Sequence, residues 1–189
     1  MYMIYELEEW VGIPPDKVYS GDVDLDREAL GILREELEDR LIEDIGYVLA
    51  VLDARIVGDG VVVSLGNDPN VYFPVKYRVL AYQPVRGEVV KAVVTKVERA
   101  SLLLNLGPTT GKVPRDQIMD EPVEIDDRSG IVRGMQSKRE VEEGDVVRAR
   151  ITHIAKPGRL ATMYLISLTM KGGGLGKEEW IEASAKKEG

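Results

Sequence analysis

The chain has 189 residues, of which 44% are hydrophobic and 31% are charged. That length suits one large domain or two small ones, and the composition is that of a folded protein and excludes wholesale disorder. The chain contains no cysteine, which excludes disulfide scaffolds, cysteine-ligated zinc sites and thiol nucleophiles, and favours an intracellular setting.

Charge is distributed unevenly along the chain. The formal net charge is −8, yet residues 1–82 hold 7 Lys and Arg against 17 Asp and Glu, a balance of −10, whereas residues 83–189 hold 18 against 16, a balance of +2. Such an asymmetry is typical of a protein with one assembly surface and one surface that faces a polyanion, although a solvated acidic helix would give the same count. The N-terminus lacks the features of a signal peptide and no segment approaches 18 uninterrupted apolar residues, so we expect no membrane partner.

The first part of the chain is predicted to be α+β, an antiparallel sheet with one main helix. Apolar and polar residues alternate in Met1–Val11 and again in Val71–Tyr82, which predicts two strands. Between them, leucines recur at helical spacing and predict an amphipathic helix with Asp24 or Asp26 as its N-cap. These leucines are Leu30, Leu33, Leu37 and Leu41, within the segment Arg27–Leu41.

A hairpin is predicted after the helix. Gly46–Ile56 is rich in residues that favour strands, the segment Gly58–Gly60 is a strong turn signal, and Val61–Leu65 has the character of the returning strand. Strand character and charge balance both change at Gln83-Pro84. We therefore expect one domain over residues 1–82 and a second over residues 83–189.

The second domain is predicted to be all-β. Five short runs of strand-like sequence are typical of a small closed barrel. The long polar stretch Met119–Gly144 between the third and fourth runs predicts a small inserted hairpin, and Trp180 and Ile181 predict a short docked helix within Lys177–Lys187. The five runs are Val85–Val97, Ser101–Leu106, Gly111–Val113, Val146–Ala155 and Met163–Met170.

One acidic sequence imitates a calcium-binding loop and fails at the positions that matter. Asp22, Asp24 and Asp26 have the spacing with which such a loop begins, but Arg27 stands at its glycine position and Leu33 at its terminal glutamate position. These aspartates are better explained as helix-capping and surface acids.

Other candidate chemistry also lacks its residues. The stretch Gly172–Lys177 departs from a phosphate-binding loop, because Lys171 and Glu178 occupy the positions of its leading glycine and its hydroxyl residue. His153 is the only histidine, which leaves little material for a metal site or a catalytic triad. We predict no catalytic residue, no metal site and no cofactor.

The second domain resembles the ribosomal S-one type RNA-binding module, a five-stranded barrel of the OB class. That resemblance is carried by Arg86–Val90, Asn105–Pro108, Gly111–Val113, Gln117-Ile118 and Glu143–Ile151. With further matches elsewhere, nearly the whole chain resembles the family of the E-prime subunit of archaeal RNA polymerase, the counterpart of the seventh subunit of eukaryotic RNA polymerase II. The further matches are Ile13–Pro15, Ile32–Glu35, Asp44–Val48, Tyr77–Pro84, Gly130–Gly134, Leu168–Met170 and Leu175–Ile181.

The resemblance implies a non-catalytic stalk subunit with two domains. In that family the protein pairs as a heterodimer with the small F subunit of RNA polymerase, its N-terminal tip domain docks on the polymerase core, and its barrel reaches toward single-stranded nascent RNA. It would act in the cytoplasm of an archaeal-like cell, or in the nucleus if it is eukaryotic. The loops Leu41–Gly46 and Gly58–Asn70 are our candidates for the core contact. Their candidate core-docking residues are Asp44, Ile45, Gly46, Gly58, Asp59 and Gly60.

The barrel departs from the family pattern where RNA is bound. Such modules stack bases on aromatic residues of the second and third strands, but Ala100, Leu103 and Pro114 stand at the matching positions. Cations remain that hold phosphates without reading bases, which predicts weak, sequence-tolerant binding; if about 4 phosphates are neutralised, log affinity should fall with log salt with a slope of about −3. The candidate RNA-binding residues are Lys96, Arg99, Asn105, Lys112, Arg115, Arg148, Arg150 and Arg159.

Two other functions remain open from the sequence. A free-standing OB-fold RNA-binding protein of translation or RNA decay would use the barrel alone and would have no need of residues 1–82. A hydrolytic enzyme on an OB scaffold has less support, because no general base or metal cluster converges in the sequence. Purification with polymerase subunits instead of ribosomes would separate the polymerase role from the free-standing one.

Overall fold

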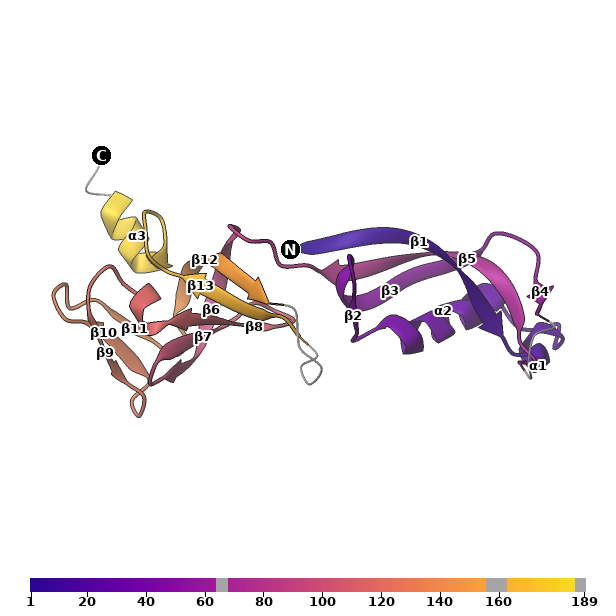
Figure 1. Cartoon of the computed structure of the whole chain (residues 1–189), viewed down its shortest axis with the longest axis horizontal. Coiled ribbons are helices and arrows are strands. Elements are labelled where there is room, and N and C mark those ends of the chain that lie inside the picture. Colours follow the sequence, from indigo (N-terminus) through magenta and orange to yellow (C-terminus); the bar gives the residue numbers. More distant parts are fainter. Residues whose placement is uncertain (64–67, 156–162, 186–189) are drawn as a thin grey trace. The chain divides into compact units, whose positions relative to one another are not determined.

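The chain divides into two compact units, Met1–Gln83 and Pro84–Gly189. The computed structural model describes residues 1–63, 68–155 and 163–185. Each unit has its own sheet and its own buried core (Figure 1). In the described part of the chain, no helix is long and apolar enough to cross a membrane.

The first unit is an antiparallel sheet with a helix on one face (Figure 1). The strand order is β1-β5-β3-β2, and β4 adds to β5. The main helix, α2, packs on β3 and β1, as the predicted α+β arrangement requires. The elements are β1 (Tyr2–Ile13), α1 (Pro15–Val18), α2 (Leu25–Leu37), β2 (Leu41–Ile42), β3 (Gly46–Ile56), β4 (Val61–Val62) and β5 (Val71–Tyr82).

Helix α2 begins at the predicted cap. The carboxylate of Asp24 accepts hydrogen bonds from the backbone N–H groups of Asp26 and Arg27, at 3.1 and 3.3 Å, which satisfies two amides that the first turn leaves open. Ala29 and Leu33 are fully buried between the helix and the sheet. The sheet residues of the same core cluster are Val11, Ile13, Val48, Val51, Val75, Tyr77 and Val79.

The helix ends earlier than the leucine spacing predicts. Its last residue is Leu37, and Leu41 lies in β2. Asp39 has a φ of 59°, outside the helical region, and its N–H donates to the carbonyl of Val48 at 3.0 Å. The chain therefore turns back onto β3 before Leu41 is reached.

The predicted hairpin between β3 and Val61–Leu65 is wrong. β3 pairs with β5 and β2, while β4 pairs with β5; residues 64 and 65 lie outside the described part. The glycines lie against β5 instead. A Cβ at Gly60 would be 2.6 Å from the ring of Phe73, and one at Gly58 would be 2.9 Å from Pro74. These glycines therefore permit a close approach to β5.

The second unit is a closed five-stranded barrel of mixed strand direction, as predicted. Its strand order is β13-β8-β7-β6-β12, and pairing of β12 with β13 closes it; β14 adds to β12. The pairing of β8 with β13 is parallel. Leu102, Leu104, Ile151 and Leu168 fill the core with at most 1% exposure. The strands are β6 (Val89–Glu98), β7 (Ser101–Asn105), β8 (Thr110–Pro114), β12 (Val146–Ala155), β13 (Leu165–Thr169) and β14 (Gly176–Lys177).

The insertion in the barrel is larger than the predicted hairpin. It is a three-stranded sheet of β9 (Val123–Asp126), β10 (Ile131–Gly134) and β11 (Glu140–Glu142), which follows the short 3-10 helix η1 (Arg115–Gln117). The predicted terminal helix is present as α3 (Glu178–Ala185).

Candidate nucleic-acid interface

A row of residues crosses the outer face of the barrel over five neighbouring strands. Lys96 on β6 pairs with Leu103 on β7, which pairs with Lys112 on β8. Ser167 on β13 and His153 on β12 continue the row around the barrel. We call these five residues the barrel row. Neighbouring strands lie about 4.8 Å apart, so the two lysines extend from positions about 10 Å apart. The row crosses the face of strands two and three, with which OB-folds bind oligonucleotides.

One acid lies beside the two lysines. Glu98 accepts a hydrogen bond from the Ser101 hydroxyl at 2.9 Å, and the ammonium of Lys112 lies 3.4 Å from the same carboxylate oxygen. These hydrogen bonds, with the nearby charge of Lys96, hold the pKa of Glu98 below its ordinary value. Glu98 is therefore ionised at neutral pH and reduces the positive charge of the barrel row.

Two of the predicted RNA-binding arginines contact the inserted sheet. The Arg99 guanidinium donates to the Asp127 carboxylate at 2.9 Å, and that of Arg115 donates to the carbonyl of Val123 at 2.6 Å. The Arg99 side chain is 90% exposed, so its ion pair is weak and its charge stays accessible. Arg115 instead bonds β9 to the barrel.

Arg148 lies beside the C-terminal helix. It sits on β12 opposite Lys91 of β6, and both cations approach the carboxylate of Glu178 at the start of α3, at 3.8 and 2.8 Å. Lys91 precedes Lys96 by five residues of the same strand, about 17 Å at about 3.3 Å per residue. The Arg148 site is therefore separate from the lysines of the barrel row.

The remaining candidates have different surroundings. Arg150 is exposed on β12 opposite Thr169, close to the His153 end of the barrel row, and the described residues offer it no ion pair. Asn105 is exposed at the end of β7, but its side-chain oxygen accepts the N–H of Gly107 at 2.8 Å and so shapes the turn into β8. Arg159 lies outside the described residues.

The structure thus places Lys96 and Lys112 two strand spacings apart on the outer face, with Arg150 and the exposed His153 two strands further along. Sequence reasoning missed Lys91 as a neighbour of Arg148, although alternation along β6 places Lys91 on the outer face. It also missed that His153 joins the row, because alternation from the buried Ile151 would turn His153 inward and only the register shift between these two residues turns it outward. These groups suit contacts to phosphates. Among the described residues, no group of three or more His, Asp and Glu could hold a metal ion.

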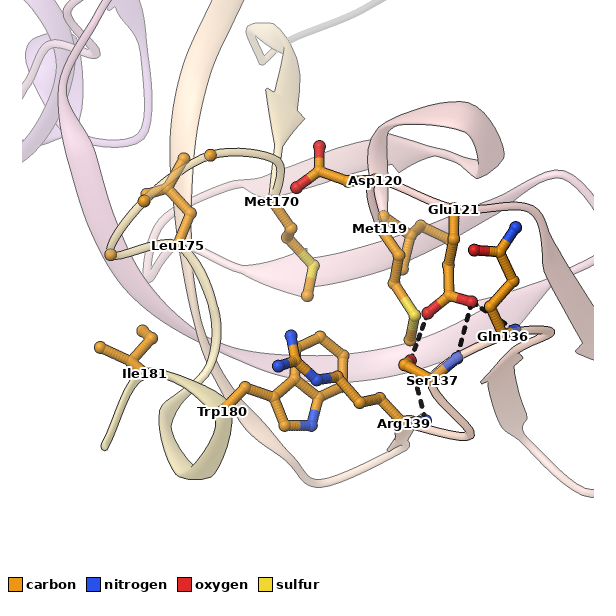
Figure 2. A pocket seen from close by; sticks show the side chains of 14 residues that line it. Met119, Asp120, Glu121, Gln136, Ser137, Arg139, Met170, Leu175, Trp180 and Ile181 are labelled. Carbon is orange, nitrogen blue, oxygen red and sulfur yellow. Dashed lines mark hydrogen bonds between the residues drawn. The ribbon is translucent and has the colours of Figure 1, made fainter. Parts of the chain in front are cut away.

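A cavity of about 790 Å³ lies elsewhere on the second unit, between the segment after η1, the β10–β11 turn, the loop after β13 and α3 (Figure 2). Its floor is apolar, with Met119, Met170 and Leu175 each at most 8% exposed. The Arg139 guanidinium lies over the ring of Trp180, 5.8 Å from the ring centre. This contact, and the close packing of the ring on the loop before α3, make Trp180 the anchor of the helix.

The rim of this cavity is acidic. The carboxylate of Glu121 accepts hydrogen bonds from the hydroxyl and the N–H of Ser137, the latter at 2.9 Å, and from the N–H of Gln136. These bonds, led by that of the Ser137 hydroxyl, hold the pKa of Glu121 below its ordinary value. Asp120 adds a second carboxylate to the lining. These two carboxylates outnumber the one guanidinium of the lining, that of Arg139, so we place the cavity outside the candidate RNA interface.

The candidate core-docking residues lie at opposite ends of the first sheet. Gly46 begins β3 and Gly58 follows its end, and a strand of 11 residues separates them by about 35 Å. Gly46 has a φ of 102°, and a Cβ there would be 2.6 Å from the carbonyl oxygen of Tyr82, at the end where the chain leaves the unit. The two groups of residues therefore form two separate patches of the unit.

Their exposure differs as well. Asp44 is exposed, whereas Ile45 packs against the core of its own unit and Gly46 is buried. At the other end, Gly58, Asp59 and Gly60 are all exposed. The second group is thus the more accessible to a partner.

Two family models match the chain, one for each unit. The S1 RNA binding domain matches residues 83–162, and the SHS2 domain found in the N terminus of Rpb7p and Rpc25p matches residues 8–69. The two matched ranges do not overlap. The SHS2 match lies within the first unit, and the S1 match begins one residue before the second unit.

Curated relatives match nearly the whole chain. The DNA-directed RNA polymerase subunit Rpo7 of Saccharolobus solfataricus is 35% identical over 98% of this chain and 100% of its own length. The Rpo7 subunit of Sulfolobus acidocaldarius is 36% identical over 99% of this chain and 98% of its own. The RNA polymerase II subunit rpb7 of Schizosaccharomyces pombe is 28% identical over 63% of this chain and 73% of its own.

Among solved structures, one titled as a putative exosome complex RNA-binding protein aligns with 51% of this chain and 48% of its own. Its TM-score is 0.36 and its identity 23%. A likeness of that extent carries no argument about function.

Proposed function

Since the chain belongs to the family of RNA polymerase subunits named Rpo7 in archaea and Rpb7 in eukaryotes, we propose that it acts as the non-catalytic stalk subunit of a DNA-directed RNA polymerase. It pairs with the small F subunit, docks on the polymerase core with its first unit, and binds nascent single-stranded RNA with its barrel. In an archaeal-like cell it works in the cytoplasm. The observation that carries the proposal is the similarity to Rpo7 along the full length of both chains.

The first unit favours this function over a free-standing RNA-binding protein. A free-standing protein that used its barrel alone would be expected to match RNA-binding families only over residues 83–162. This chain also matches, over residues 8–69, a domain found in the N terminus of polymerase subunits. The phosphodiester chemistry belongs to other chains of the enzyme, and this chain supplies positioning.

RNA contact is assigned to the lysines of the barrel row together with Arg150. They carry charge on one continuous part of the outer face, and none of them is committed to the inserted sheet or to α3. Because the row offers Leu103 on its second strand, and its one ring is the imidazole of His153 at the far end, we expect it to hold phosphates with little stacking of bases. Binding is therefore weak and tolerant of sequence.

Core docking is assigned to the end of the first unit that carries Gly58, Asp59 and Gly60. This end lies about 35 Å from the end where the chain leaves the unit, and its loop is exposed. A crosslinking map of the assembled polymerase should place these residues near the core. A map that placed them only against solvent would remove the assignment.

Pairing with the F subunit is tested by co-expression of the two chains. A one-to-one complex should elute as a single species on size-exclusion chromatography. Separate elution of the two folded chains at micromolar concentration would contradict the pairing, and would leave core docking to be judged from the crosslinking map.

A further inference from the structure

Strand β1 lies at the edge of the first sheet and has one open side. It is 12 residues long, and within residues 1–63, 68–155 and 163–185 it pairs with β5 alone. Gln83 donates its N–H to the carbonyl of Met1 at 2.8 Å, and the amino group of Met1 donates back to the carbonyl of Gln83. This pair fixes the alternation of the antiparallel ladder, which continues without a register shift to Ile13. Odd-numbered residues of β1 therefore bond to β5, and the even-numbered ones direct N–H and C=O outward.

The side chains of these even-numbered residues share one face of the sheet. Val11 and Ile13 are buried toward α2, so their even-numbered neighbours project from the opposite face. On that face Tyr2, Ile4 and Trp10 are 54%, 60% and 57% exposed. Glu6 and Glu8, also exposed, stand between them.

Most of the usual protections of an open strand edge are absent from β1. Proteins commonly block such an edge with charged side chains, lysine above all, or with proline, a bulge or a very short strand. β1 contains no lysine and no proline, is long, and pairs with β5 without a bulge. The charges of β1 are all acidic, so they repel an acidic strand and admit a basic one. We propose that β1 is a docking edge, to which an extended segment of a partner polypeptide adds as a further strand. Strand addition of this kind takes its affinity from main-chain hydrogen bonds and its specificity from alternate side chains.

The pattern along β1 defines the chemistry of that segment. In a sheet, an apolar side chain is most stable directly opposite another apolar side chain, and a charged side chain directly opposite one of opposite charge. The partner strand therefore carries apolar residues opposite Tyr2 and Ile4, Lys or Arg opposite Glu6 and Glu8, and an apolar residue opposite Trp10. The ion pair of Glu8 with Lys76, at 3.7 Å and half exposed on both sides, is too weak to prevent this.

A second copy of this chain does not fit the pattern. Antiparallel pairing of two β1 strands over their length, with Tyr2 opposite Gly12, would place Glu6 opposite Glu8 twice. Like charges directly opposite one another are destabilising. The occupant is thus a different chain, with a basic centre.

The inference rests on the proposed function, because the basic strand belongs to another chain of the polymerase assembly. Hydrogen exchange resolved to single amides tests it, on the free full-length chain and on the same chain within the polymerase with which it purifies. In the free chain, the odd-numbered amides of β1 should be protected while those of Ile4, Glu6 and Glu8 exchange fast. In the assembly these three should become protected. Fast exchange in both states would overturn the inference while leaving the polymerase role intact, and protection already in the free chain would show that another part of this chain, or a second copy, covers the edge.

Two variants at one position isolate the backbone contribution. Glu8→Pro removes an outward N–H that bonds nothing within the sheet, so the fold tolerates it at an edge. Glu8→Thr also loses the carboxylate but keeps that N–H. Assembly should be about tenfold weaker for Glu8→Pro than for Glu8→Thr. Equal assembly by two variants with equal thermal stability would overturn the inference, and failure of the unaltered chain to purify with polymerase would remove the proposed function first.

Discussion

Glu98 sets the net charge of the barrel row. It lies 3.4 Å from the ammonium of Lys112 and close enough to Lys96 for that charge to lower its pKa. Glu98→Gln should therefore raise the affinity for single-stranded RNA by up to about fivefold, since exposed pairs of this kind contribute about 0.2–1 kcal/mol. Fluorescence anisotropy with a labelled oligoribonucleotide measures the change. Glu140→Gln is the matched control, because Glu140 pairs with Arg133 on the inserted sheet; equal affinities of the two variants would contradict the placement of RNA on the row.

Phosphate contacts without base stacking have a salt dependence that can be measured. RNA held only by the three assigned cations, Lys96, Lys112 and Arg150, neutralises three phosphates, and at about 0.7 each these give a slope of log affinity against log salt near −2, shallower than the sequence alone predicts. Tyr164, the aromatic residue directly before β13, is the test for stacking, and Tyr164→Ala should leave this affinity within about twofold. A salt-independent isotherm, or binding lost on the tyrosine change alone, would show that stacking and not charge holds the RNA.

The sequence could not predict which partner each cation bonds, because these partners lie several to many residues away along the chain. Val123 and Glu178, which bind Arg115 and Arg148, lie 8 and 30 residues away. Alternation along a strand shows that such a side chain points outward, and it does not show which neighbour it meets. Lys112 lies outward as alternation along β8 predicts, whereas alternation along β6 would place Lys96 with the buried Ala92 and Val94, and the register shift after Val94 turns it outward.

Lys177 joins the C-terminal helix to the barrel. Its ammonium lies 2.9 Å from the carboxylate of Asp145, and both side chains are less than a fifth exposed. Burial alone would lower the pKa of Lys177, but the hydrogen bond and charge of Asp145, with those of Glu179, raise it above its ordinary value. The contact thus stabilises the folded chain fully below the pKa of an unfolded lysine, about 10.4, and is lost as pH rises through the higher folded value.

Replacing this lysine should therefore cost stability at neutral pH. Lys177→Gln leaves the carboxylate of Asp145 poorly paired, so we expect the free energy of unfolding at pH 7 to fall by about 1–3 kcal/mol in urea titrations. Lys91→Gln removes an equal charge from an exposed pair and should cost less than about 1 kcal/mol. The difference between the two variants should shrink above about pH 11. Equal losses at pH 7 would mean that the Lys177 contact has no special role.

At the scale of elements, local signals predicted most of the fold. Leucine spacing and the Asp24 cap located α2, and alternation located β1 and β5, because these signals lie within a few residues. The hairpin after β3 was wrong because pairing is decided by distant residues. β5 pairs with both β3 and β4. Gly58 and Gly60, which the sequence marks as a turn, instead allow the chain to pack closely against β5.

For the whole molecule, the two units divide the charge and the tasks that we propose. The acidic first unit has an open strand edge and an exposed loop at its far end, which suit assembly with other chains. The barrel has cations on one part of its outer face, which suit a transcript. The division explains why similarity to polymerase subunits covers both units and not the barrel alone.

The most direct test is purification of the full-length, affinity-tagged chain from the cells that make it, with every associated protein identified and quantified by mass spectrometry. The account predicts the large polymerase subunits and the F subunit at one copy each for every copy of this chain. Recovery of the chain alone, or with ribosomal or RNA-decay proteins and no polymerase subunit, would contradict it.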